Sequence, residues 1–378
     1  MENILFLFDC VIKCIDFYFD MFYNFYTIVI FYKNKEKRVY MINTKIRLKF
    51  FVLTIILVLA FIFSFSIGRY PVKFFEVIKV IVDRIFYGIV SDSVQSTIIW
   101  NIRIPRVLCA MLVGAGISTS GALFQGLLKN PMVSPDILGA TQASAFGSAF
   151  GILMYFNFFE ITLLSFSLGI LSVFVTYTLS KIFRSDRILG LILTGMMIGS
   201  LFSSLISFVK LVADTENQLP SITYWLMGSL ASVKMIDFKF IFFPIVIGLI
   251  VSNLYKIEIN IFTMGEEEAK TLGLNTEKIR FIIIFFATLM TASSVAVTGI
   301  IGWIGLVIPH FSRLIFGDDY RFVIPASGLL GASFLLVVDI LCRNITTSEI
   351  PIGIVTSFIG APIFLYLIYK KGRDYDRG

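Results

Sequence analysis

The chain has 378 residues, of which 57% are hydrophobic and 15% charged, and its mean hydropathy is +0.88. Soluble domains carry roughly 45–50% apolar and about 25% charged residues, so this composition excludes a water-soluble globular fold. The net charge of +7 does not indicate nucleic acid, because the basic residues lie in short loops beside apolar runs, where charge sets orientation in a membrane. The four cysteines and the single histidine have no ligand-like spacing, so neither a disulfide framework nor a zinc site is predicted.

The first forty residues stand apart from the rest of the chain. They are rich in Phe, Tyr, Ile and Asn but carry charges at Asp9, Lys13, Asp16 and Asp20. Each central charge costs roughly 2.5–3.5 kcal/mol in a spanning helix, so this segment is a poor membrane span. No small-residue cleavage site follows it, which argues against a signal peptide. We expect that Met41 is the true start, because the purine-codable residues before it fit a ribosome-binding site, and that residues 41–378 form one transmembrane domain.

Apolar runs suited to crossing a bilayer follow one another from residue 47 to the C-terminus. A spanning helix needs about 20 such residues, and the runs are 47–68, 105–128, 134–156, 161–183, 188–212, 238–255, 279–301, 302–316, 322–342 and 352–369. They lack the alternation of membrane barrel strands. The predicted fold is therefore all-α, a polytopic transmembrane bundle of about ten spanning helices. An even number of spans, with Lys and Arg beside the first, fourth and last, places both termini in the cytoplasm.

Some cations fall on the external side by this count. The segment between the first two runs carries Arg69, Lys73, Lys79, Arg84, Arg103 and Arg106, and a later external loop adds Lys234 and Lys239. Short external loops usually lack such residues. Contact with an external partner would explain them.

The run at 188–212 presents small residues at every fourth position. Gly195, Gly199, Ser203 and Ser207 share one face of the predicted helix, and residues 143, 147 and 151 form a similar stripe in an earlier run. Small residues allow membrane helices to approach closely. We favour close packing between helices for these stripes and keep a substrate path as the alternative.

The longest charged insertion between late runs is Thr263–Arg280, with the sequence TMGEEEAKTLGLNTEKIR. Three consecutive glutamates suit a helix N-terminus, Gly273 suits a left-handed C-cap, and Thr276 is the predicted cap of the helix that re-enters the membrane. This pattern predicts a helix, a tight turn and a second helix on the cytoplasmic face. The segment is either a solvated interfacial loop or a knob that docks on a cytoplasmic partner.

No residue pattern provides enzymatic chemistry. Gly is never followed by Lys, so the chain has no phosphate-binding loop and no ATPase site of that type. His310 is the only histidine, and no Ser or Cys motif surrounds a nucleophile. Asp339 is the clearest acid within an apolar run, but Arg343 lies one helical turn later, where the two can pair. A paired acid is a weak basis for ion-coupled transport.

Five ordered sequence blocks resemble a known family. They are IRIPRVLCAMLVGAGISTSGALFQGLLKNPMVSPDILG from Ile102, YWLMGSL from Tyr224, MGEEEAKTLGLN from Met264, GIIGWIGLVIPHFSRLIFGDDYR from Gly299 and SEIPIGIVTSFIGAPIFLYLI from Ser348. From about Met41 to its end, the chain resembles the FecCD-type permease family, the transmembrane subunits of ABC importers for iron-siderophore, haem and cobalamin.

The resemblance implies an assembly and a cargo. It implies a homodimer or close heterodimer around a central pathway, two cytoplasmic ABC ATPase subunits, an external substrate-binding protein and the bacterial cytoplasmic membrane, with no cofactor and no resident metal. An iron(III)-siderophore complex is the favoured cargo, and haem and cobalamin stay open. The alternative from another class is an ion-coupled secondary transporter.

The resemblance also implies roles for individual residues. The ATPase-coupling segment comprises Gly265, Glu266, Glu267, Ala269, Leu272, Gly273 and Leu274. Arg103, Arg106 and Arg343 match outer-face positions that meet acidic residues of the binding protein. The pathway and gate candidates are Gly195, Gly199, Ser203, Ser207, Trp225 and Gly228.

Overall fold

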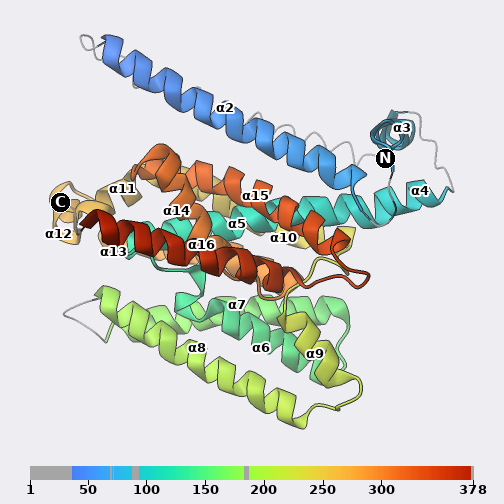
Figure 1. Cartoon of the computed structure of the whole chain (residues 1–378). Helices are drawn as coiled ribbons and strands as arrows, with labels where there is room; N and C mark the ends of the chain where they lie inside the picture. Colours follow the sequence, from blue (N-terminus) through green and yellow to red (C-terminus); the bar gives the residue numbers. More distant parts are fainter. Residues whose placement is uncertain (1–35, 69, 71, 87–92, 183–186, 376–378) are drawn as a thin grey trace.

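A computed structural model describes residues 36–375 except 69, 71, 87–92 and 183–186 (Figure 1). The described part is helical, with no strand. Residues 1–35, and with them most of the predicted N-terminal extension, lie outside the described part.

Each of the ten predicted runs contains one main helix. These helices are α2 (Glu36–Ser66), α5 (Ile104–Leu127), α6 (Ala140–Leu153), α7 (Phe158–Ser180), α8 (Arg187–Val212), α10 (Met235–Leu254), α13 (Thr276–Thr298), α14 (Ile304–Phe316), α15 (Tyr320–Asn344) and α16 (Ile352–Tyr375). Seven helices of the described part are long and apolar enough to cross a membrane, whereas α14 and the apolar part of α16 are shorter. The prediction of an all-helical polytopic bundle is confirmed.

Shorter helices lie at the ends of the bundle and in the connections between its long helices. They are α3 (Phe74–Phe86), α4 (Val94–Thr97), α9 (Gln218–Leu226), α11 (Lys256–Met264), α12 (Glu266–Thr271), the π-helical turn η1 (Ile98–Arg103) and the 3₁₀ turn η2 (Pro135–Leu138). We call the two ends of the bundle the α12 end and the α3 end. The start of α2 and the end of α16 both lie at the α12 end (Figure 1).

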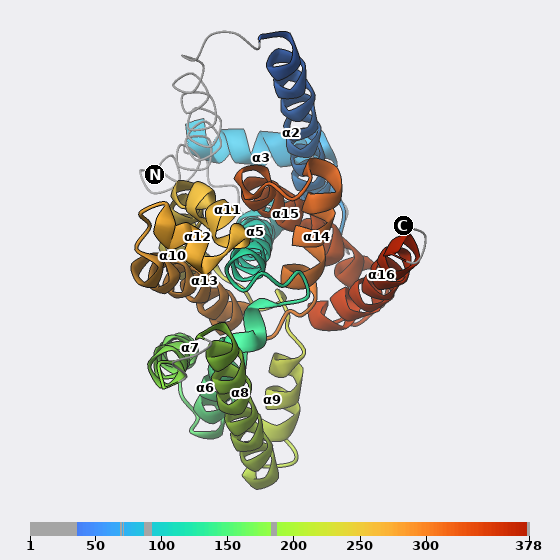
Figure 2. The ribbon, with the colours of Figure 1, turned by 90° about the vertical axis from the view of Figure 1, so that its left-hand side faces the viewer.

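Helix α5 is the centre of the larger part of the bundle, with α10, α13, α14 and α15 packed around it (Figure 2). Small residues permit this packing: a Cβ on Gly114 would overlap the carbonyl of Gly331, and one on Gly121 would overlap that of Gly305. The Ser118 hydroxyl also donates across the interface to the Ser327 carbonyl oxygen at 2.7 Å. Close backbone approach and hydroxyl bonds of this kind hold helices together where water provides no hydrophobic drive.

Helices α6, α7, α8 and α9 form a second group beside this core (Figures 1 and 2). Gly147 of α6 packs against Ser165 of α7, and Gly195 of α8 packs against the Ile137 carbonyl of η2. A Cβ at either position would collide with backbone atoms. The close packing favoured for both small-residue stripes is therefore present at these positions.

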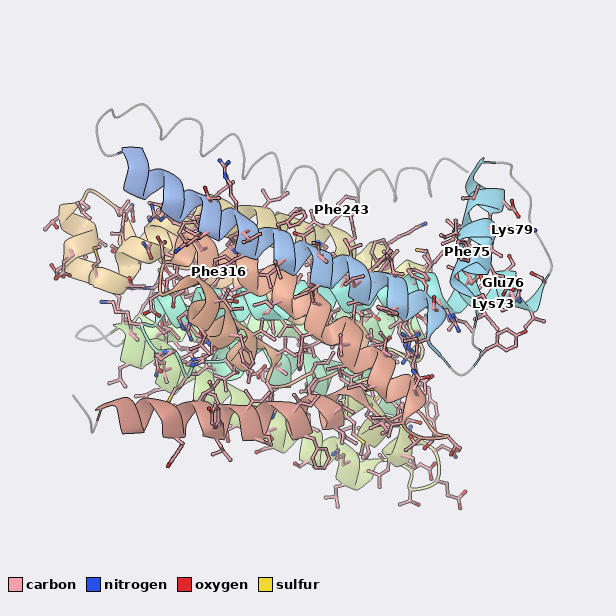
Figure 3. All side chains as sticks on the ribbon, turned by 45° about the horizontal axis from the view of Figure 1, so that its top comes forward. Lys73, Phe75, Glu76, Lys79, Phe243 and Phe316 are labelled. Carbon is pink, nitrogen blue, oxygen red and sulfur yellow. The ribbon has the colours of Figure 1, made fainter. Side chains whose placement is uncertain are left out.

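Helix α3 lies across the α3 end rather than along the bundle (Figures 1 and 3). Val77 is buried against the bundle, while Phe75 and Lys79 are exposed. Such an amphipathic helix suits the membrane interface. The search for long apolar runs did not predict it, because only one side of α3 is apolar.

Candidate functional sites

The charged insertion folds at the α12 end as predicted, with one correction. Helix α12 follows Gly265, and Gly273 has a φ of +82°, the left-handed conformation expected of a helix C-cap. The next helix, however, is capped by Asn275, whose side-chain oxygen accepts from the Lys278 backbone N–H at 3.0 Å. Thr276 is the first residue of that helix, so its predicted role as the cap is wrong.

One face of α12 is anchored and the other is exposed. Ala269 is fully buried and Leu274 packs against the core, whereas Glu267 and Leu272 project outward. Inside this turn, the Arg280 guanidinium donates to the Glu266 carboxylate at 2.5 Å. The segment is thus a rigid projection that is fixed to the start of α13.

The Glu266 carboxyl is held in its charged form. Burial alone would raise its pKa, but the hydrogen bond and charge of Arg280, together with the charges of Lys270 and Arg187, bring the pKa below the ordinary value of 4.5. The anion that fastens α12 to α13 is therefore present at neutral pH.

A buried charge network occupies the α3 end. The Arg106 side chain donates to Asp339 at 2.8 Å and to Glu349 at 2.9 Å. Arg343 lies 3.0 Å from the other Asp339 oxygen, which confirms the pairing predicted from their one-turn spacing. Asp339 itself has no exposed surface. The network joins α5, α15 and the loop before α16.

Of the three arginines expected to meet a binding protein, Arg106 and Arg343 belong to this network and Arg103 lies near it, and all three are buried. Arg103 and Arg106 are 3% exposed and Arg343 is 6% exposed. Arg103 donates to the backbone carbonyls of Phe65 and Tyr70, and Arg343 donates to Ser64 Oγ at 2.8 Å. In the single chain their charges are therefore met by internal partners, and a docking role for these positions stays a prediction. Among the described residues, Lys73, Lys79, Lys234 and Lys239 are exposed cations at this end.

The stripe on α8 divides into two halves. Gly195 is buried and Gly199 lies near Gly139 of the adjacent turn, but Ser203 and Ser207 are exposed. The Ser207 hydroxyl donates to the Ser203 carbonyl oxygen at 3.0 Å, within the helix itself. Gly195 and Gly199 therefore form a packing contact, whereas Ser203 and Ser207 form an exposed polar face in the single chain.

The loop after α9 is a junction of three segments. Gly228, with a φ of +75°, packs against the Ile300 carbonyl, and its own carbonyl accepts from the Ile352 N–H at 2.8 Å. Half-buried Trp225 precedes it, and the Trp225 carbonyl contacts Gly299 so closely that a Cβ there would overlap. The YWLMGSL segment therefore couples α9 to the end of α13 and to the start of α16.

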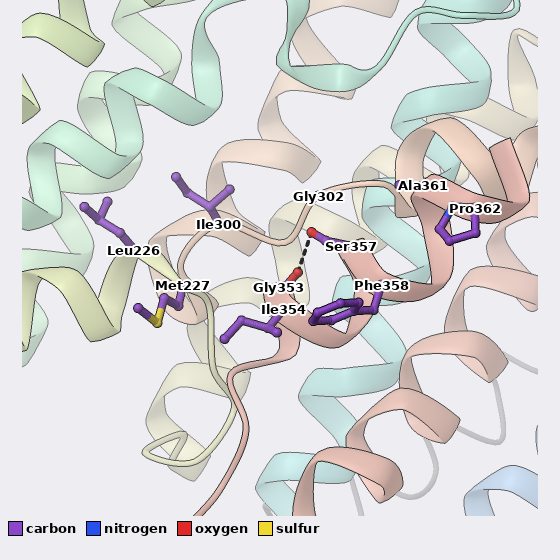
Figure 4. A pocket seen from close by; sticks show the side chains of 10 residues that line it. All are labelled: Leu226, Met227, Ile300, Gly302, Gly353, Ile354, Ser357, Phe358, Ala361 and Pro362. Atoms are coloured by element: carbon purple, nitrogen blue, oxygen red, sulfur yellow. Dashed lines mark hydrogen bonds between the residues drawn. The ribbon is translucent and has the colours of Figure 1, made fainter. Parts of the chain in front are cut away.

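A mainly apolar cavity of about 610 Å³ opens beside this junction (Figure 4). Leu226 and Met227 line one side and Ile354 and Phe358 of α16 line the other. The Ser357 hydroxyl is turned back onto the Gly353 carbonyl at 2.7 Å. No group of three or more potential metal ligands occurs among the described residues, so the lining has no built metal site.

Sequence reasoning missed the acidic partners of Arg106. Asp339 and Glu349 lie 233 and 243 residues away along the chain, and no local spacing could connect them. It also missed Arg280 as the partner of Glu266, 14 residues away, although a basic residue at the start of an apolar helix next to three acids was an available signal.

The structure is a polytopic helical bundle with a projection, α12, at one end, an architecture typical of membrane transport subunits. The chain belongs to the FecCD transport family, whose model matches residues 56–370. It is 36% identical to the molybdate import system permease protein MolB of Haemophilus influenzae, over 85% of this chain and 96% of that protein. It is 37% identical to the Fe(3+)-citrate import system permease protein YfmE of Bacillus subtilis, over 73% of this chain and 83% of that protein.

A solved structure also matches the fold of this chain. The transmembrane part of a metal-chelate-type ABC transporter in an inward-facing conformation matches with a TM-score of 0.76 and 36% identity, over 85% of this chain and 98% of that one. The chain is therefore a multi-pass inner-membrane ABC importer permease, a subunit type that has no ATPase site of its own and works with ATPase and binding-protein partners.

Proposed function

We propose that this permease carries an iron(III)-siderophore complex inward across the cytoplasmic membrane. The α12 projection carries the proposal for the transport role: it is exposed on one face, anchored by Glu266 and Arg280 on the other, and lies at the opposite end from α3. A rigid element of this kind can transmit a displacement from a bound motor subunit to the bundle.

The proposed assembly contains two copies of this chain, two cytoplasmic ATPase subunits and one external binding protein. The α12 end then faces the cytoplasm and the α3 end faces outward, with both termini inside. Lys73, Lys79, Lys234 and Lys239 are exposed at the α3 end and suit the acidic lobes of a binding protein. In this arrangement the buried Arg106–Asp339–Arg343 network supports that surface from behind.

The proposed mechanism is a coupled switch between two arrangements. ATP binding draws the motor subunits together, and Glu267, Leu272 and their neighbours carry that movement into α13 through the Glu266–Arg280 pair. Helix α13 ends beside Gly299, in the junction where Gly228 of the loop after α9 also bonds the start of α16. In this mechanism the ATPase contact at α12 and the junction at the other end of the bundle both act on α13. Energetic coupling requires such a shared element.

The cargo is proposed to be the intact chelate rather than a bare ion. The α8 face is polar through Ser203 and Ser207, and the junction cavity is mainly apolar, so neither offers ligands that would strip a metal. A path of this chemistry suits a bulky complex bound weakly, with selection left to the binding protein.

An oxyanion such as molybdate is the second candidate cargo. One observation favours it: the relative named for molybdate import aligns over 85% of this chain. Haem and cobalamin use the same kind of machinery and remain further candidates.

Uptake in a strain deleted for the gene tests these cargoes. Labelled ferric siderophore, molybdate, haem and cobalamin are supplied one at a time, with and without the gene restored. Loss and recovery of siderophore uptake alone supports the proposal. Loss of molybdate uptake alone identifies molybdate as the cargo instead. Uptake that persists after ATP depletion while the proton gradient is held would overturn the ATP-driven mechanism.

A further inference from the structure

A second pocket, of about 490 Å³, opens at the α12 end of the bundle. It lies among the end of α5, the end of α11, helix α14 and the start of α15, with α16 at its edge. Lys129, His310 and Arg313 give it cationic or titratable groups, while Leu314 and Leu367 give it an apolar side. None of these residues belongs to the α12 projection or to the junction around Gly228.

Arg313 is the most deeply placed charge in this pocket. Its side chain is 9% exposed, and its Nη1 donates to the Gln125 side-chain oxygen at 2.6 Å. Gln125 is itself fixed, because its amide nitrogen donates to the carbonyls of Val133 at 3.1 Å and Leu306 at 3.3 Å. Among the described residues, Arg313 Nη2 has no hydrogen-bond partner within normal geometry. Neutral groups, the Gln125 oxygen and the nearby Tyr320 hydroxyl, therefore face this guanidinium and leave part of it unsatisfied.

Arg313 also lacks a close counter-charge. Within 4.0 Å the described residues give it one carboxylate, that of Asp318, which is 4.0 Å from its Nε and 93% exposed. By contrast, Arg106, Arg280 and Arg343 each lie within 3.0 Å of a carboxylate. A buried charge without a close partner is costly, because the desolvation of the guanidinium is not offset. The site favours the arrival of an anion.

Lys129 adds a second cation at an unusual backbone position. It follows the last residues of α5 with a φ of +50°, a conformation in which glycine is the usual choice. An L-residue there costs roughly 1–2 kcal/mol relative to the right-handed conformation. The lysine side chain, which is exposed and lines the pocket, offers a reason for keeping this residue where glycine would relieve the backbone.

We propose that this pocket binds a phosphate group, with Arg313 and Lys129 as its ligands and His310 at its side. Arginine suits phosphate because its planar guanidinium can donate two parallel hydrogen bonds. The group comes either from an anionic phospholipid headgroup or from free phosphate. Exposed Leu314 and buried Leu367 in the same lining favour the lipid, since acyl chains can lie against the helix ends, and basic pockets between spanning helices bind such headgroups. Asp318 is already 93% exposed, so its carboxylate does not fill the space beside Arg313.

Ligand titration of the full chain in a neutral detergent tests the site. Dioctanoyl phosphatidylglycerol, dioctanoyl phosphatidylcholine and inorganic phosphate are added at fixed ionic strength, and affinity is read from the shift of the unfolding midpoint. We expect saturable stabilisation by phosphatidylglycerol. If inorganic phosphate stabilises the chain at equal concentration, the source is free phosphate. If only the lipid does, the source is the headgroup.

Two variants and one matched control separate binding from folding. Arg313→Gln should weaken binding about 10- to 100-fold, the usual effect of losing a charge-assisted contact. Lys129→Gly should also weaken binding, yet it should fold at least as well, because glycine relieves the left-handed backbone. Arg321→Gln removes a half-exposed arginine at the same end that does not line the pocket and should bind like the parent chain.

Two results would overturn the proposal. One is that phosphatidylglycerol and inorganic phosphate both fail to stabilise the parent chain. The other is that Arg313→Gln binds the probes as the parent chain does; if that variant does not fold, the comparison with Lys129→Gly decides in its place.

Discussion

Asp339 shows how one residue can decide the state of a whole charge cluster. It has no exposed surface and lies between Arg106 at 2.8 Å and Arg343 at 3.0 Å, while Glu349 supports Arg106 from the other side. Buried ion pairs contribute little net stability when complete, because desolvation offsets the attraction, but removal of one member leaves an uncompensated charge. The cluster is therefore sensitive to loss of its shared acid.

Asp339→Asn should destabilise the protein by about 3–5 kcal/mol, the range for a broken buried ion pair. Chemical unfolding in detergent measures the difference. Asp318→Asn is the control, because Asp318 is 93% exposed and should change the free energy of unfolding by about 0.5 kcal/mol or less. An Asp339→Asn variant as stable as the parent would show that other groups neutralise the two arginines.

Residue pairs were predictable from the sequence only where they are local. The Asp339–Arg343 pair follows from helical spacing, since residues four apart share a face. The partners of Arg106 are more than 230 residues distant, so only the folded bundle brings them together. The charge pattern singled out a segment rich in cations, but it could not distinguish buried Arg103 from exposed Lys73.

At the scale of elements, Gly273 fixes the direction in which the chain leaves α12, the helix proposed to contact the ATPase. Its φ is +82° and a Cβ there would meet nothing within 4 Å, so only backbone conformation restricts the residue. Gly273→Val should cost roughly 1–2 kcal/mol locally and turn α12 away from its docked position. We expect ATP hydrolysis to continue while uptake falls several-fold, measured in proteoliposomes that contain the full transporter.

Gly273→Asn is the matched control for this variant. Asparagine tolerates the left-handed region better than other non-glycine residues, and the space around position 273 is open, so uptake should stay close to that of the parent. Equal transport by the valine and asparagine variants would remove Gly273 from the coupling path.

The link between α12 and α13 should depend on pH in the acid range. The pKa of Glu266 lies below 4.5 because Arg280 and Lys270 outweigh the effect of burial. The stabilisation is therefore complete above about pH 4.5 and is lost as the pH falls through the lower folded-state pKa. Amide hydrogen exchange in α12, corrected for the intrinsic rate, should rise in that window. Glu266→Gln should abolish the pH dependence; an unchanged profile in that variant would assign it to another group.

Elements were predicted best where a single physical requirement sets them. The ten apolar runs each contain a helix because the bilayer leaves backbone groups no other partner than their own helix. Boundaries that depend on side-chain geometry were harder, as the cap at Asn275 in place of Thr276 shows. Helix α3 was missed because its 13 residues are too few to span a bilayer and its apolar residues are interrupted by Glu76, Lys79, Asp83 and Arg84.

At the scale of the whole molecule, the two helix groups differ in what they leave uncovered. Helix α5 is largely enclosed, whereas the apolar membrane-spanning stretch of α8 is only 22% buried within the single chain. Exposed residues on α8 include Met196, Met197, Leu201 and Phe208, beside the polar Ser203 and Ser207. A helix surface of mixed character is poorly suited to lipid alone, which supports the proposed second copy with a pathway between the two.

The pathway proposal makes Ser203 and Ser207 accessible to water in the assembled transporter. Cysteines placed at these two positions should react with a hydrophilic, membrane-impermeant thiol reagent at least about 10-fold faster than one at Leu171, an exposed position on α7 that should face lipid. The native Cys109 and Cys342 are buried and contribute little background, and Cys10 and Cys14, which lie outside the described residues, are replaced by serine in the test chain. The rates are measured with the resting complex and with ATP present, because alternating access predicts that the label reaches the two serine positions to different extents in the two states. Equal slow labelling at all three positions would place this face of α8 against lipid and move the pathway elsewhere in the bundle.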